Sequence, residues 1–135
     1  MPIFNVVGGG TSESGPGNYQ ASAVDLTVVA QTSIVTVPAD KRLIIERVDV
    51  IIDPTVVGVG FMPKIQFGIN GDTDSMLAPV LLSPDMINPN KIERWMASEL
   101  LDAVIPAGES IEFGVTEASG VATHTATVVV YGFLV

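Results

Sequence analysis

The chain has a single histidine, His124, and it is the first residue to consider for acid–base chemistry. His124 shares the alternation of Ala122, Ala126 and Val128, whereas the threonines at 123, 125 and 127 occupy the opposite positions. A catalytic base would need a nucleophile beside it and a carboxylate to orient it, and the local sequence supplies neither. We therefore predict a packed or interface histidine.

Oxygen ligands stand at alternate positions in the segment Asn70-Gly71-Asp72-Thr73-Asp74-Ser75, which is how a calcium loop begins. Such a loop needs glycine at its sixth position and glutamate at its twelfth, where this chain has Ser75 and Leu81. Asn-Gly also favours a tight hairpin turn. We favour the turn over a weak divalent-cation site.

The remaining chemical patterns lack specificity. Val57-Gly58-Val59-Gly60 has neither the lysine nor the strand–loop–helix setting of a phosphate loop. The pair Asp102 and Glu109 would suit a glycosidase, but the chain has fifteen acidic residues, so such a pair carries little weight. A metal enzyme of the cupin type would need two or three histidines. We expect no enzymatic activity, no metal and no cofactor.

Length and composition indicate one folded domain. The chain has 135 residues, 47% of them hydrophobic and 16% charged, and its mean hydropathy is +0.49. This composition excludes disorder as the main state, and the length allows a single core. The formal charge of −9 repels nucleic acid and anionic lipid, so we expect neither as a partner.

The N-terminal residues form a predicted arm and linker over residues 1–20, ahead of a domain over residues 21–135. Residues 8–18 are rich in glycine and serine, which is typical of a flexible linker. The preceding residues predict an arm that docks on the domain or on a neighbour, with a frayed terminus as the alternative. Its apolar contact residues would be Ile3, Phe4, Val6 and Val7.

No signal peptide precedes the glycines, and the longest uncharged apolar run, residues 126–135, is about half the length that a membrane-spanning helix needs. We expect synthesis in the cytoplasm and no transmembrane segment.

Beyond residue 20, short β-rich runs alternate with turn residues, which predicts an all-β fold with a single antiparallel sandwich. The apolar phase changes within residues 42–53, so we predict a bulge near Glu46 and Arg47. Two Pro-Ala corners, at residues 37–40 and 105–108, each precede a strand. The predicted interior contains Leu43, Ile45, Val48, Val50, Ile65, Phe67, Ile69, Ile111, Phe113, Val115, Val128 and Val130.

Residues 85–102 fit two interpretations. Asn90 and Glu93 have the spacing of a helix capping pair, with apolar residues following at helical intervals. The prolines at 84 and 89 mark loops instead, and residues 95–105 could form a strand. We favour a strand or an extended loop.

The charges divide along the chain. All six basic residues lie between Lys41 and Arg94, whereas residues 95–135 hold five acids and no base. Two faces of opposite sign would suit packing of identical subunits or docking on a large surface. Charge scattered over a solvated surface is the alternative.

A glycine-rich N-terminal arm, Pro-Ala corners, the passage Phe67-Gly68-Ile69-Asn70-Gly71 and a final strand ending at Val135 together resemble small virion proteins of tailed bacteriophages. Residues 30–135 look most like capsid decoration, or cement, proteins with a jelly-roll-like β-sandwich. The resemblance implies a homotrimer on the outer surface of the phage head that contacts the major capsid protein and stabilises the shell. It implies no catalytic residue.

The C-terminal run, residues 127–135, is apolar on both faces. In a two-layer sandwich we expect nothing from the same chain to cover its outer face, so another subunit would do so. The predicted contact residues there are Val129, Tyr131, Phe133 and Val135. The alternative function is a carbohydrate- or receptor-binding sandwich of a tail or head fibre, for which Trp95 and Tyr19 would be the aromatic platforms.

Overall fold

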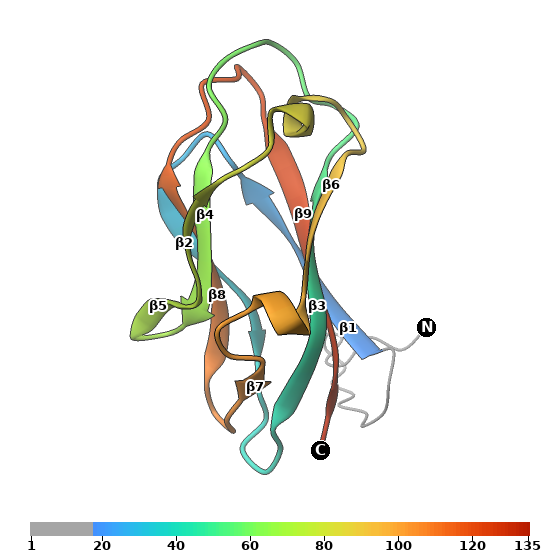
Figure 1. The fold of residues 1–135 in the computed structure, drawn as a ribbon, viewed down its shortest axis with the longest axis vertical. Coiled ribbons are helices and arrows are strands. Elements are labelled where there is room, and N and C mark those ends of the chain that lie inside the picture. The colour runs from blue at the N-terminus through green and yellow to red at the C-terminus, as the bar shows by residue number, and fades with distance from the viewer. Residues whose placement is uncertain (1–17) are drawn as a thin grey trace.

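The computed structural model describes residues 18–135, which form nine strands and two short 3-10 helices (Figure 1). In chain order these elements are β1 (Asn18–Asp25), β2 (Ala30–Thr36), β3 (Leu43–Ile52), β4 (Lys64–Ile69), β5 (Asp72–Leu81), η1 (Pro84–Ile87), β6 (Ile92–Met96), η2 (Ala97–Glu99), β7 (Val104–Ile105), β8 (Ser110–Glu117) and β9 (Thr125–Leu134).

The strands form two antiparallel sheets packed face to face. One sheet has the order β1-β9-β3-β6, with β7 also paired to β3, and the other has the order β2-β8-β4-β5. The chain passes repeatedly from one sheet to the other, and this double Greek-key order is that of a jelly roll. The predicted all-β sandwich of jelly-roll type is confirmed.

Both predicted corners are present, and they touch. Lys41 N donates to Pro38 O at 3.2 Å, and Glu109 N donates to Pro106 O at 3.3 Å, which closes the two turns. Gly108 has a φ of +83°, a value that favours glycine. Val37 then bonds to both sides of the second turn, because its N donates to Glu109 O and its O accepts from Gly108 N, each at 2.9 Å. We call this end of the sandwich the corner end.

The predicted bulge lies in β3, where the register with β9 shifts between Ile45 and Arg47. The extra residue lets Leu43 and Ile45 on one side, and Val48 and Val50 on the other, all face the core. Gly132 of β9 lies beside the bulge, and a Cβ there would meet a backbone oxygen at 2.3 Å, so a larger residue does not fit without displacing the strand.

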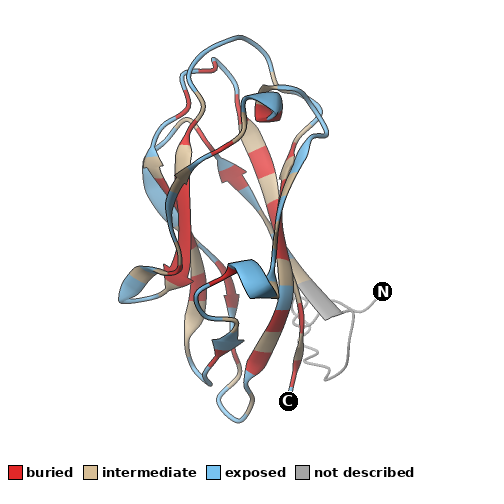
Figure 2. Cartoon of the chain, in the orientation of Figure 1, coloured by how far each residue is buried: buried red, intermediate tan, exposed pale blue. Residues whose placement is uncertain are grey.

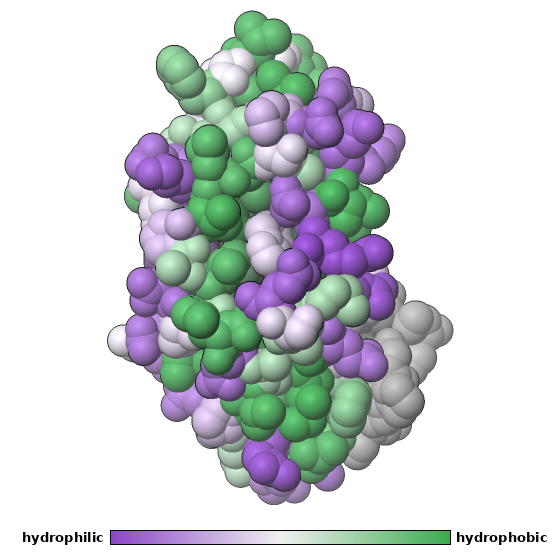
Figure 3. All heavy atoms as spheres, viewed as in Figure 1, coloured by the Kyte–Doolittle hydropathy of each residue, from purple (hydrophilic) through white to green (hydrophobic). Residues whose placement is uncertain are grey.

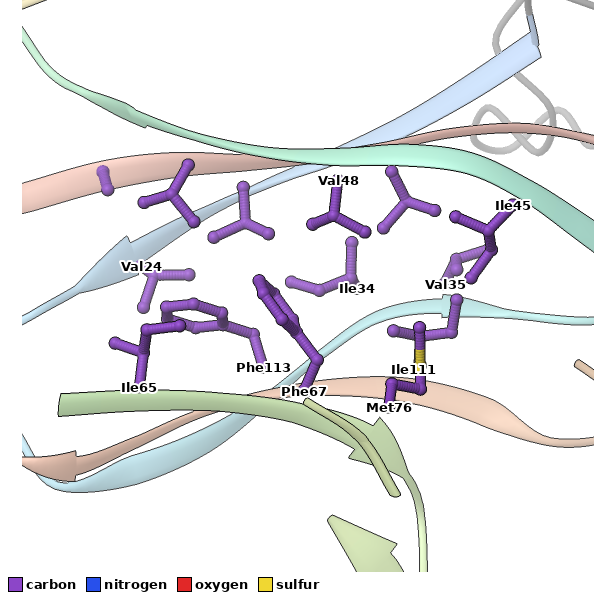
Figure 4. Packing of buried hydrophobic residues seen from close by; sticks show 14 of the residues in the cluster. Val24, Ile34, Val35, Ile45, Val48, Ile65, Phe67, Met76, Ile111 and Phe113 are labelled. Carbon is purple, nitrogen blue, oxygen red and sulfur yellow. The ribbon is translucent and has the colours of Figure 1, made fainter. Parts of the chain in front are cut away.

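Side chains from both sheets interdigitate in one core (Figure 4), and Figure 2 shows buried residues on strands of both sheets. The rings of Phe67 and Phe113 lie 5.2 Å apart at its centre, and Trp95 meets Phe67 edge-on at 5.4 Å. Of the predicted interior residues all are buried except Ile69, which is half-buried and packs against the core.

Residues 85–102 contain no α-helix. They form η1, the extended strand β6 and η2, so the favoured interpretation of strand and extended loop is confirmed. The helical spacing of Ile92, Trp95 and Met96 was misleading because a strand alternates: Trp95 faces the core, and its two neighbours in that set face outward.

Candidate functional site

His124 is fully buried, and its hydrogen bonds link three parts of the chain. Its Nε2 donates to Met86 O at 2.9 Å, and its Nδ1 lies 2.7 Å from Ser119 Oγ. Ser119 Oγ also accepts from Val121 N at 3.1 Å. A carbonyl oxygen only accepts, so Nε2 must carry a proton. The predicted packed histidine is confirmed.

Residues 70–75, the candidate calcium loop, begin with a hairpin turn, as predicted. Ile69 pairs with Asp72 across Asn70 and Gly71, and Gly71 has a φ of +93°. The Asn70 side chain is used within the fold, where its Oδ1 accepts from Ser110 N at 2.9 Å. Within residues 18–135 no group of three or more His, Cys, Asp or Glu side chains is placed to hold a metal ion.

The described part of the chain has no pocket. None of its helices is long and apolar enough to cross a membrane. The candidate sites that it offers are three patches on its surface.

The first patch is the outer face of β9. Val135 is exposed there, Tyr131 and Phe133 are half-buried, and Val129 is only 5% exposed. The expectation that nothing from the same chain covers this face is therefore wrong at Val129, which lies in register between Ala21 of β1 and Asp49 of β3. The other predicted contact residues, Ile3, Phe4, Val6 and Val7, lie outside the described residues.

The second patch is a charged cluster beside Val129 on the same face. Arg94 forms a bidentate pair with the buried Asp49, at 2.8 Å from Nε and 2.9 Å from Nη2. Arg47 approaches the same carboxylate at 3.7 Å, and its guanidinium lies 3.8 Å from the centroid of the Tyr131 ring. The hydrogen bonds to Asp49 raise the pKa of Arg94 above its ordinary value. The Asp49 carboxylate thus hydrogen-bonds one guanidinium group and forms a longer ion pair with a second on the outer face.

Sequence reasoning missed this cluster. Its signal was the pair Arg47 and Asp49, two residues apart in a mostly apolar strand and hence on one face of it. The partner Arg94 lies 45 residues further on, and only the pairing of β3 with β6 brings it there.

The third patch lies opposite the corner end, where residues 26–29, 54–63 and 118–124 connect the strands. We call it the loop end. Val59 and Phe61 are 84% and 85% exposed. Val28, Val29 and Val57 are also exposed there. Figure 3 shows apolar surface gathered at this end, at the top of the view. The sequence signal was an uncharged apolar run at residues 55–62 that lacks the alternation of a strand.

The loops of the loop end are bonded to one another. Val57 and Thr123 exchange backbone hydrogen bonds of 3.2 and 3.1 Å, and Gly120 N donates to Phe61 O at 2.9 Å. A Cβ on Gly60 would lie 2.2 Å from the carbonyl carbon of Gly120, so these two glycines allow the backbones to meet. The exposed side chains therefore project from loops whose backbones are held in place by hydrogen bonds.

Trp95 is not an aromatic platform for a sugar, because its half-buried ring packs against Phe67 in the core. This removes one of the two residues on which the carbohydrate-binding alternative depended. The exposed aromatic ring of the described domain surface is instead that of Phe61.

No protein-family model and no curated protein matches the sequence. Solved structures with a similar fold include a chain in the acid-stable capsid of Helicobacter pylori bacteriophage KHP30, with a TM-score of 0.58, 8% identity, and coverage of 90% of this chain and 93% of that one. A chain in the capsid of Ralstonia phage GP4 has a TM-score of 0.59 and 10% identity, and the match covers 98% of this chain and 90% of that one.

A third similar chain belongs to the capsid asymmetric unit of cyanophage Pam1, with a TM-score of 0.52, 15% identity, and coverage of 98% of this chain and 99% of that one. At such identities the likeness concerns the fold. The whole jelly roll, rather than a fragment of it, is common to this chain and to chains of three phage capsids.

Proposed function

We propose that this chain is a structural protein of a phage virion, and more specifically a capsid decoration, or cement, protein. It is made in the host cytoplasm and binds as a homotrimer to the outer surface of the head, where its partners are further copies of itself and the major capsid protein. The observation that carries the proposal is the likeness of the complete fold to chains of three phage capsids.

The physical character of the domain supports the same conclusion. A cement protein must resist deformation and offer surfaces, and this domain has one continuous core and apolar patches at its surface. The contacts that we propose are the arm residues Ile3, Phe4, Val6 and Val7 toward the shell, and the outer face of β9 between copies. On that face Tyr131, Phe133 and Val135 remain accessible, whereas Val129 is buried.

The proposal is tested on heads of the phage that encodes this chain, prepared with and without it. We expect electron microscopy to show additional density on the outside of the shell when the protein is present, and we expect those heads to withstand heating better. Heads that show no added density and no gain in heat resistance would contradict the decoration role.

Deletion of residues 1–17 is expected to weaken attachment to such heads at least tenfold and to leave the domain folded, because β1 begins only at Asn18. The measurement is a binding titration on heads, with circular dichroism of the free protein as the control for folding. A truncated protein that binds as tightly as the full chain would show that the arm has no docking role.

Replacement of Phe133 and Val135 together by serine is expected to raise the dissociation constant between copies at least tenfold, because both side chains would lose burial against a neighbour. Sedimentation at micromolar concentration measures this constant. Leu81→Ser is the control, since Leu81 is apolar and about as exposed as Val135 but lies on the other sheet. An unchanged sedimentation profile of the double variant would remove the outer face of β9 from the interface.

A further inference from the structure

We propose that copies of this chain also meet at the loop end, through Val59 and Phe61, so that the loop ends of neighbouring subunits gather around the axis of the assembly. The inference rests on the proposed function for the existence of an assembly, and it adds a contact that the arm and β9 do not provide.

Two loops of the loop end expose apolar side chains. Val57, Val59 and Phe61 are exposed on one loop, and Val28 and Val29 are exposed on the adjoining one. Ser119 N donates to Leu26 O at 2.7 Å, which holds the second loop against the segment that bonds to Phe61. Contiguous apolar surface presented by several loops of one domain is typical of an interface.

Hydrogen bonds hold the backbone of the exposed loop in place. The loop of residues 54–63 is tied to residues 118–124 by the hydrogen bonds of Val57 and Phe61, and Ser119 in turn is bonded to the buried His124. Because the backbone of this loop is held in place, its side chains lose little further conformational freedom when a partner covers them. An exposed phenylalanine on a fixed loop is therefore suited to binding.

The distribution of charge favours a second copy as the occupant of the loop end. Residues 54–63 and 118–124 contain no charged residue. Around them lie four acids and two bases, and the pair formed by Lys64 and Glu117, at 3.2 Å, neutralises itself. These flanking residues are Asp25, Asp53, Lys64, Asp85, Lys91 and Glu117.

The corner end carries most of the negative charge of the described domain. Eight acids lie in that half of the sandwich against three bases there, Lys41, Arg42 and Arg47. The acids are Asp40, Glu46, Asp72, Asp74, Glu99, Asp102, Glu109 and Glu112. Two chains that each carry a charge of −9 repel one another, and contact at the loop ends keeps their acidic ends farthest apart. Each loop end also offers the other an apolar, uncharged surface.

The experiment uses the absence of cysteine from the chain. In Val59→Cys protein a short bis-maleimide is expected to link copies into covalent dimers on a denaturing gel. Ala107→Cys is the control, because Ala107 is also exposed, in the turn at the corner end, and we expect little linking there. Linking of Val59→Cys no greater than that of Ala107→Cys would overturn the proposal.

A second variant tests the energetics. Phe61→Ser is expected to raise the dissociation constant of the assembly at least tenfold without unfolding the domain, because the ring is exposed. Leu101→Ser, which removes a side chain that is 76% exposed toward the corner end, is expected to leave the constant unchanged. Wild-type protein that sediments as a monomer at tens of micromolar would also overturn the proposal.

The outcomes separate this inference from the proposed function. If Phe61→Ser assembles normally but no longer binds heads, the loop end contacts the shell rather than a second copy, and the inference is overturned while decoration stands. If Val59→Cys links efficiently and Phe61→Ser disperses the assembly, but the wild-type protein does not bind heads, the loop-end contact stands and decoration does not.

Discussion

Phe113→Ala is expected to lower the free energy of unfolding by about 3–5 kcal/mol, the usual cost of removing a fully buried ring. Phe113 has no exposed surface and lies on β8, between β2 and β4, where its ring packs against that of Phe67. Alanine would leave a cavity that the strands on either side cannot close, because their hydrogen bonds fix the spacing of the sheet.

Chemical denaturation followed by circular dichroism measures this loss. Phe61→Ala is the matched control, since it removes the same ring from a position that is almost fully exposed, and we expect a change within about 0.5 kcal/mol. A loss below about 1 kcal/mol for Phe113→Ala would mean that this ring does not occupy the centre of the core.

The second large effect is expected for His124→Ala, which should lower the free energy of unfolding by about 2–4 kcal/mol. The substitution removes a buried ring and leaves Met86 O without the partner that the imidazole supplies, whereas Ser119 Oγ keeps its bonds with Val121 N and Phe61 O. An unsatisfied buried polar group costs about 1–3 kcal/mol, so the loss at Met86 O adds to that of the cavity.

Ser119→Ala is the comparison for His124→Ala because it removes one of the two hydrogen bonds and keeps the ring. We expect a smaller loss, of about 1–2 kcal/mol, and a non-additive double variant because the two side chains share a bond. Equal stability of His124→Ala and wild type would contradict the role of His124 as the fastening between η1 and the loop end.

Local patterns in the sequence were enough to predict much of the fold. The change of apolar phase around Glu46 located the bulge, because a strand can bury both halves of such a run only if one residue is extra. The dipeptide Asn70-Gly71 likewise located the hairpin, since it accommodates the left-handed backbone of a two-residue turn.

What the sequence did not predict depends on contacts between distant segments. The carboxylate of Asp49 meets Arg94 only because β3 pairs with β6, and the register neighbours of the buried Val129 are residues far from it in sequence, on β1 and β3. The sequence also did not predict that Phe61 is exposed. Aromatic residues are ordinarily buried, and only the placement of the loop at the end of the sandwich directs this one outward.

The position of β9 also bears on how the protein is made. β9 is the last strand in the sequence, yet it lies between β1 and β3 in the sheet and provides the pairing for both. On the ribosome, β1 has no neighbour in its own sheet until residues 125–134 have emerged from the exit tunnel. The sheet that contains β1 therefore forms only once β9 is available, in a late step governed by contacts of high sequence separation.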